Sequence, residues 1–142
     1  MAVGRAVRSV AASPSAVWAV LADHLDIATW LPGLAVSLER EGMPAPGGVG
    51  AIRVITGPRT TMREEITTFE PNHTLAYRGL SGLPLPDWTG QVELAELGSD
   101  TVVRWSISAR ASFPGADLLL SGAAQALLFS LVRSVRRHAA AG

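Results

Sequence analysis

Residues 114–137 read PGADLLLSGAAQALLFSLVRSVRR, and this stretch decides the fold that the sequence predicts. Pro114 and Gly115 end the preceding strand pattern. From residue 116 onward, apolar residues recur every three or four positions, which is the period of an α-helix. The residues expected on or beside the apolar face of this helix are Leu120, Ala124, Leu127, Leu128, Phe129, Leu131, Val132 and Val135. Such a face needs a partner surface.

Residues before the helix alternate as strands do. An opening strand over residues 6–12 ends at Ser13-Pro14, a pair that favours the start of a short helix, and Asp23 is placed to cap a second short helix reaching Trp30. A strand over residues 36–40 follows. Five further strands begin near Val49, Thr60, Thr74, Trp88 and Thr101. The connections between them are short and rich in turn formers, which is typical of antiparallel neighbours.

This order of elements predicts an α+β fold with about seven antiparallel strands and a long helix after the last strand. A sheet of that length must curl and cover its apolar face, and only the long helix can cover it. A pocket remains between the two layers if the facing residues are small. The small residues expected there are Gly79, Gly90, Gly122, Ala123, Ala124 and Ala126. Close packing without a void is the alternative.

Length and composition exclude several classes of protein. With 142 residues, the chain has the size of one domain spanning 1–142. Its formal net charge is +0, so we expect no nucleic-acid partner. It has no cysteine, hence no disulfide or thiolate chemistry, and charges near the N-terminus argue against a signal peptide. We therefore expect a cytoplasmic protein, either a monomer or a homodimer.

The apolar run Leu118–Val132 is about fifteen residues long, below the roughly 18 that a membrane-spanning helix requires. We therefore expect no stable membrane insertion. Arg133, Arg136 and Arg137 follow this run. They are interpreted as solvated residues that complement the helix dipole, with contact to anionic lipid as the alternative.

Alternation turns one charged pair toward the interior. Arg53 shares a face with Ala51 and Ile55, and Glu64, in the next strand, has apolar residues two positions away on each side. A buried carboxylate is costly, so Glu64 should be paired with Arg53 or partly protonated. We interpret the pair as a polar clamp for a ligand carbonyl or hydroxyl. A purely structural ion pair is the alternative.

Aromatic residues complete the candidate ligand-binding site. Tyr77 offers a hydroxyl to the same ligand group, and Trp30, Trp88 and Trp105 offer flat apolar walls. For all four, plain core packing is the alternative, and Trp18 is assigned to the core.

Histidines and sequence motifs suggest no other chemistry. His24, His73 and His138 lack the spacing of metal ligands. His24 is expected to be a surface residue near a helix cap, with a place at the pocket mouth, where it could act as an acid or base, as the alternative. No nucleophile motif and no glycine-rich phosphate loop is present. We therefore predict no catalytic residue, no metal and no cofactor.

Six short segments occur in order along nearly the whole chain. They are ASPSAVW (12–18), residues 23–32, GAIR (50–53), REEI (63–66), LAYR (75–78) and GSDTVVRW (98–105). With these segments the sequence resembles the START-like or SRPBCC superfamily, and especially its bacterial polyketide cyclase/dehydrase-like branch. The resemblance implies the helix-grip fold, in which a curved sheet wraps around a long C-terminal helix and two short helices follow the first strand.

The resemblance also implies a range of functions, because members bind lipids, hormones or polyketides and a minority are enzymes. Our leading hypothesis is a non-catalytic binder or carrier of a small hydrophobic molecule. A polyketide cyclase or dehydratase that uses Glu64, Arg53 or Tyr77 is the second, and a protein-interaction module without a ligand is the third. Similarity to the hormone-receptor branch favours inward positions for these three residues. It also suggests that residues 81–86 form a gate, with an ordinary hairpin connection as the alternative.

Overall fold

Helices and strands follow one another in the order that the sequence predicts. The structure, a computed structural model, describes residues 1–141. Its elements are β1 (Ala2–Val10), α1 (Pro14–Leu21), the 3-10 turn η1 (His24–Asp26), α2 (Ile27–Trp30), β2 (Ala35–Arg40), β3 (Ile52–Thr56), β4 (Thr61–Glu70), β5 (Thr74–Ser81), β6 (Thr89–Leu97), β7 (Asp100–Ala109) and α3 (Ala116–Ala141).

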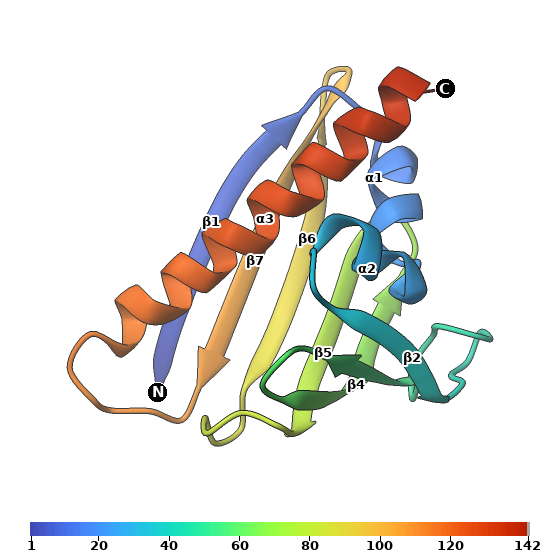
Figure 1. The fold of residues 1–142 in the computed structure, drawn as a ribbon. Coiled ribbons are helices and arrows are strands. Elements are labelled where there is room, and N and C mark those ends of the chain that lie inside the picture. Colours follow the sequence, from blue (N-terminus) through green and yellow to red (C-terminus); the bar gives the residue numbers. More distant parts are fainter. Residues whose placement is uncertain (142) are drawn as a thin grey trace.

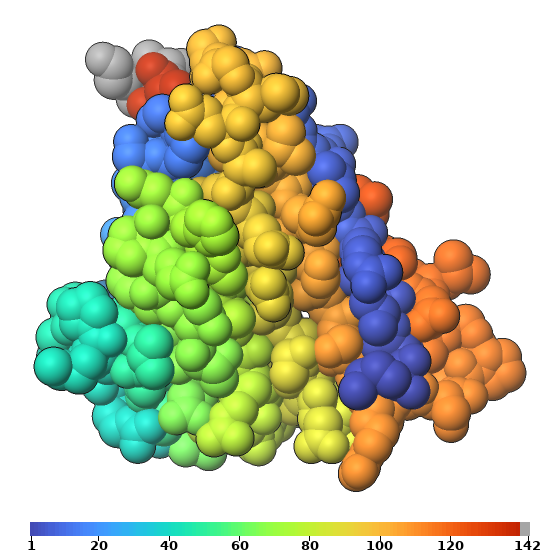
Figure 2. All heavy atoms as spheres, turned by 180° about the vertical axis from the view of Figure 1, so that it is seen from behind, coloured from blue at the N-terminus to red at the C-terminus, as the bar shows by residue number. Residues whose placement is uncertain are grey.

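All seven strands form one antiparallel sheet in the order β1-β7-β6-β5-β4-β3-β2. Strands β2 to β7 pair with their neighbours along the chain, while β1 pairs with β7, the last strand. The sheet curves, and α3 lies across its β1 and β7 end (Figure 1). Seen from behind, strands β4 to β7 lie side by side with β1 at the edge (Figure 2). The predicted α+β helix-grip arrangement is confirmed.

The two short helices differ in how they begin. Ser13 has extended backbone angles and its Oγ accepts a hydrogen bond from the Ala16 N–H at 3.2 Å, with Pro14 at the first helical position. The predicted start of α1 is therefore confirmed. Asp23 makes no side-chain capping bond, and the segment after it is a 3-10 turn followed by the four residues of α2. Asp23 therefore takes the predicted N-cap position, but its side chain does not cap the turn.

Helix α3 buries one face against the sheet and α1. The buried set is Ala116, Leu120, Ala124, Leu128, Leu131, Val132, Ser134 and Val135. The helix approaches β1 so closely that a Cβ at Gly4 would overlap the backbone at Leu120 and Ser121. This contact is possible only because Gly4 has no side chain.

The opposite face of α3 corrects the sequence prediction. Gly122, Ala123 and Ala126 are exposed, and Phe129 is 49% exposed, so these residues do not face the sheet. Ala124 alone of the four small helical residues is buried there. By length and composition, the segment Ala116–Ala139 of α3 is apolar enough to cross a membrane, since an 18-residue window in it has a mean hydropathy of 1.6. This is weak evidence for a membrane-spanning helix, since the core helix of a soluble protein can have the same length and composition.

The two strand glycines do not leave empty space either. The ring of Trp88 covers Gly79, and the ring of Tyr77 covers Gly90. A Cβ at either glycine would overlap these rings. The glycines therefore let two large aromatic side chains lie flat on the sheet, and they do not leave the empty space expected from their small size.

Candidate ligand-binding site

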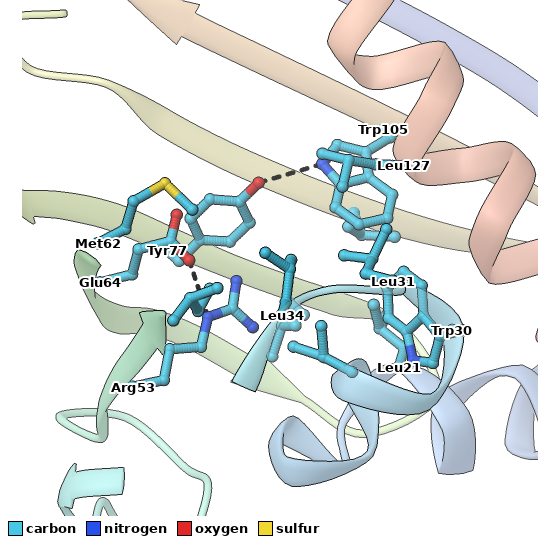
Figure 3. Close-up of a pocket in the computed structure, with 14 residues that line it drawn as sticks. Leu21, Trp30, Leu31, Leu34, Arg53, Met62, Glu64, Tyr77, Trp105 and Leu127 are labelled. Carbon is cyan, nitrogen blue, oxygen red and sulfur yellow. Dashed lines mark hydrogen bonds and ion pairs between the residues drawn. The ribbon is translucent and has the colours of Figure 1, made fainter. Parts of the chain in front are cut away.

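A cavity of about 110 Å³ lies on the concave face of the sheet, under α1, α2 and α3 (Figure 3). Most of its lining is apolar and comes from strands β3 to β7, the three helices and the connection after α2. The lining residues are Leu21, Ile27, Trp30, Leu31, Leu34, Arg53, Ile55, Met62, Glu64, Leu75, Tyr77, Val92, Trp105 and Leu127. Of the described side chains of α3, Leu127 alone lines the cavity.

The size of the cavity limits what fits without rearrangement. An engineered cavity of about 150 Å³ in another protein binds benzene, whereas pockets for drug-sized ligands reach about 300–1,000 Å³. The present cavity of about 110 Å³ is therefore suited to one ring or chain end. Leu31, Leu34, Met62 and Leu127 are its partly exposed lining residues. Movement of these flexible side chains is the simplest way to enlarge it.

The polar wall of the cavity centres on a buried ion pair. Arg53 and Glu64 are directly opposite in the register of β3 and β4, and Arg53 Nε donates to Glu64 Oε1 at 2.9 Å. Their side chains are only 6% and 7% exposed. Trp88 Nε1 donates to the other carboxylate oxygen, Oε2, at 3.3 Å. The pairing that alternation suggested is therefore present, and both oxygens of Glu64 have a donor.

Tyr77 joins this pair to the aromatic side of the cavity. The Arg53 guanidinium carbon lies 4.7 Å from the centre of the Tyr77 ring, in a cation–π arrangement. Trp105 Nε1 donates to the Tyr77 hydroxyl oxygen at 3.2 Å (Figure 3). Burial, and then the negative charge of Glu64, raises the pKa of Tyr77, so the hydroxyl keeps its proton at neutral pH.

His24 belongs to the same buried network, which corrects its predicted surface position. It is only 2% exposed. Its Nε2 lies 2.9 Å from the Gly47 carbonyl oxygen and must carry the proton, which leaves Nδ1 as the acceptor facing Arg53 Nη1 at 3.4 Å. Burial, together with the positive charge of Arg53, lowers the pKa of His24 to about 4. The ring is therefore neutral at neutral pH.

Most of the predicted binding residues gather at this cavity. Trp30, Arg53, Glu64, Tyr77 and Trp105 line it. Trp88 is not a lining residue; its ring covers Gly79, and its Nε1 donates to Glu64, which does line the cavity. Their binding role remains a prediction.

Other members of the site were missed. Leu31 and Leu34 lie in the connection after α2, where no alternation of apolar residues assigns a side chain to the interior. Met62 and Leu127 were assigned to apolar faces but not to a site. No residue of 81–86 lines the cavity, and the gating role of that segment also remains a prediction.

Two buried polar atoms have no hydrogen-bond partner among the described residues, Trp30 Nε1 and Ser134 Oγ. Within residues 1–141 there is also no group of three or more His, Asp or Glu side chains that could hold a metal ion. The donors and acceptors at the cavity wall are therefore those of Arg53, Glu64, Tyr77 and their neighbours, together with the unpaired Nε1 of Trp30, which also lines the cavity.

A family model describing polyketide cyclase/dehydrase and lipid transport proteins matches residues 1–139. The chain therefore belongs to this polyketide cyclase/dehydrase and lipid transport family. No curated protein matches the sequence.

Solved structures agree on the fold. A START superfamily protein from Mycobacterium smegmatis superposes with a TM-score of 0.82 at 12% identity, over 95% of this chain and 97% of that one. XoxI from Bacillus cereus gives 0.76 at 20% identity, over 95% and 96%. DynU16, a protein of the dynemicin biosynthetic locus, gives 0.77 at 21% identity, over 96% of this chain and 48% of that one. Identities this low show the fold alone.

Proposed function

We propose that this protein binds or carries a small hydrophobic molecule, such as a lipid or a polyketide, in the cavity between the sheet and α3. The observation that carries the proposal is an apolar cavity with one buried, hydrogen-bonded charged pair in its wall. Ligand sites typically combine an apolar lining with a few fixed polar groups that orient the ligand. Membership of a family that includes lipid transport proteins supports the same function.

Polar groups at the cavity favour binding over catalysis. General acid–base catalysis needs a base within hydrogen-bonding reach of the reacting proton. Both oxygens of Glu64 already accept N–H donors, and both ring nitrogens of His24 have partners. We therefore rank a cyclase or dehydratase activity second. The family model, which names cyclases as well as lipid transport, keeps it in consideration.

A protein-interaction module is the third candidate. The exposed residues Leu118, Leu119 and Phe129 on α3 favour it, since they are 79%, 56% and 49% exposed. That hypothesis also requires a filled interior, however, and the interior contains the cavity. Ligand binding therefore explains more of the molecule.

The test is to purify the protein natively, extract it with organic solvent and search the extract by mass spectrometry for a stoichiometric hydrophobic passenger. Leu127→Trp places a bulky indole ring at the cavity, whereas Leu118→Trp changes an exposed position on the same helix. We expect a passenger in the wild type and in Leu118→Trp, and none in Leu127→Trp. Absence of a passenger, together with no uptake of ethylbenzene by the wild type, would contradict the proposal.

A further inference from the structure

We infer that the ligand is electrically neutral and carries a carbonyl oxygen that accepts hydrogen bonds from Arg53. This inference rests on the proposed function, because it names the chemistry of the molecule that the cavity takes. It follows from counting the hydrogen-bond donors and acceptors at the cavity wall.

Arg53 has more donors than the protein satisfies. A guanidinium carries five N–H groups. Nε–H donates to Glu64, and one N–H of Nη1 faces His24 Nδ1 at 3.4 Å. The remaining N–H groups, including both on Nη2, have no acceptor among the described residues. Nη2 is not one of the fully buried unpaired atoms, so it keeps accessible surface in a residue that lines the cavity. In Figure 3 its terminal nitrogens lie on the side toward Leu34, across from Glu64.

Tyr77 adds a second unmatched donor. Its oxygen accepts from Trp105 Nε1, while its own proton has no acceptor among the described residues. Burial keeps that proton in place, since it raises the pKa of the hydroxyl. An unpaired donor in a buried site is costly, so a molecule that supplies an acceptor gains from both groups.

The acceptors at the same wall each have one donor already, and only the second lone pair of each Glu64 oxygen is left over, fewer sites than the unmatched donors. Each oxygen of Glu64 receives one N–H, and His24 presents its single free nitrogen to Arg53. A ligand that brings further donors finds few partners here. A ligand that brings an acceptor oxygen can accept hydrogen bonds from the unmatched N–H groups of Arg53.

Charge decides between a carbonyl and a carboxylate. Glu64 already neutralises Arg53, and His24 is neutral at neutral pH. A carboxylate ligand would therefore add a second negative charge beside Glu64 in a buried site, where unpaired charge is expensive. A ketone, ester or amide oxygen accepts the same hydrogen bonds without that cost.

Three probes of similar size test the inference: acetophenone, benzoate and ethylbenzene. Binding is followed at pH 7 through the indole N–H signals of the four tryptophans in two-dimensional NMR spectra of the wild-type protein. Because a hydrogen bond to a charged donor is worth about a factor of ten or more, we expect acetophenone to bind roughly tenfold more tightly than ethylbenzene. Benzoate should bind most weakly.

A double variant tests whether the N–H donors of Arg53 cause the preference for acetophenone, without leaving one charge buried alone. Arg53→Met combined with Glu64→Leu removes both charges together, so that neither charge is left buried alone, although Trp88 Nε1 loses its acceptor and His24 Nδ1 its donor. In this variant the preference for acetophenone should disappear or reverse, because its carbonyl loses hydration without gaining a charged donor. Arg78→Met is the matched control, because Arg78 pairs with Glu65 on the exposed side of the neighbouring strands. It should keep the tenfold preference.

The outcomes distinguish the two claims. If neither ethylbenzene nor acetophenone binds, the proposed function fails and the inference fails with it. If ethylbenzene binds as tightly as acetophenone, or benzoate binds more tightly than either, the cavity stands as a ligand site and the inference of a neutral carbonyl ligand is overturned.

Discussion

At the scale of single residues, the interior chemistry depends on Arg53 and Glu64. The cross-strand register places them opposite each other, and burial removes the solvent that would otherwise screen them. A buried pair contributes little net stability when intact, because both charges lose their hydration. Removal of one member, in contrast, leaves the other charge buried alone.

Glu64→Gln is therefore expected to be strongly destabilising. It leaves Arg53 without a counter-charge at a site where the Glu64 side chain is only 7% exposed. The expected loss in the free energy of unfolding is about 3–5 kcal/mol, measured by urea denaturation. The double variant Arg53→Met/Glu64→Leu should lose clearly less. Equal stability of Glu64→Gln and wild type would show that the pair is not buried as described.

His24 makes stability depend on pH. Its pKa is 6.5 in an unfolded chain and about 4 in the folded protein. Between these values the unfolded chain binds a proton that the folded protein does not, so stability falls as the pH falls from 6.5 toward 4. By pH 5.5 the expected loss from this residue is about 1 kcal/mol.

The measurement compares urea unfolding at pH 7.5 and pH 5.5 in the wild type and in His24→Gln. The variant cannot titrate at this position, so its stability should change less over this range. Identical pH dependence in the two proteins would mean that His24 is accessible to protons in the folded state.

Residue-scale prediction succeeded where a strand set the geometry. The period of two in β3 and β4 turned Arg53 and Glu64 to the same side, and the register then brought them together. His24 lies in a 3-10 turn, where no such period applies. Its burial depends on contact with Gly47, which is 23 positions away, and local sequence carries no signal for that contact.

At the scale of elements, replacing glycine by alanine should have opposite effects on stability in a strand and in α3. Gly90 lies under the Tyr77 ring, so Gly90→Ala should overpack the core and cost about 2 kcal/mol or more. Gly122 lies in α3 with no atom within 4 Å of an added Cβ. Gly122→Ala should therefore stabilise the protein by about 0.5–1 kcal/mol through helix propensity.

Thermal or urea unfolding of the two variants measures these opposite effects on stability directly. Destabilisation by Gly122→Ala would mean that this face of α3 packs against another part of the protein. Tolerance of Gly90→Ala would mean that the Tyr77 ring does not lie on the strand as described.

The apolar period of α3 predicted that the helix covers the sheet, but it could not fix the rotation of the helix about its axis. Apolar residues occur all around the segment 118–132, so the pattern left the inner face ambiguous. The contact with Gly4 settles the orientation, and it turns Gly122, Ala123 and Ala126 to the outside. Such contacts between distant segments are not visible in a local pattern.

At the scale of the whole molecule, element order determined the architecture. Six consecutive strands joined by short connections can form only a few sheets, and β1 then pairs with the last of them. The cavity was harder to predict. It lies beside Arg53, Tyr77, Trp105 and Leu127, and its volume depends on how side chains from the sheet and all three helices fill the space between layers.

Ligand uptake in that cavity is the central claim, and diffraction from crystals equilibrated with bromobenzene tests it most directly. Bromine can be located by its anomalous scattering without reference to the protein's density. We predict one strong bromine peak in the cavity, between the Arg53–Glu64 pair and Leu127. A protein that binds bromobenzene only on the exposed face of α3, with no bromine in the cavity, would contradict the account.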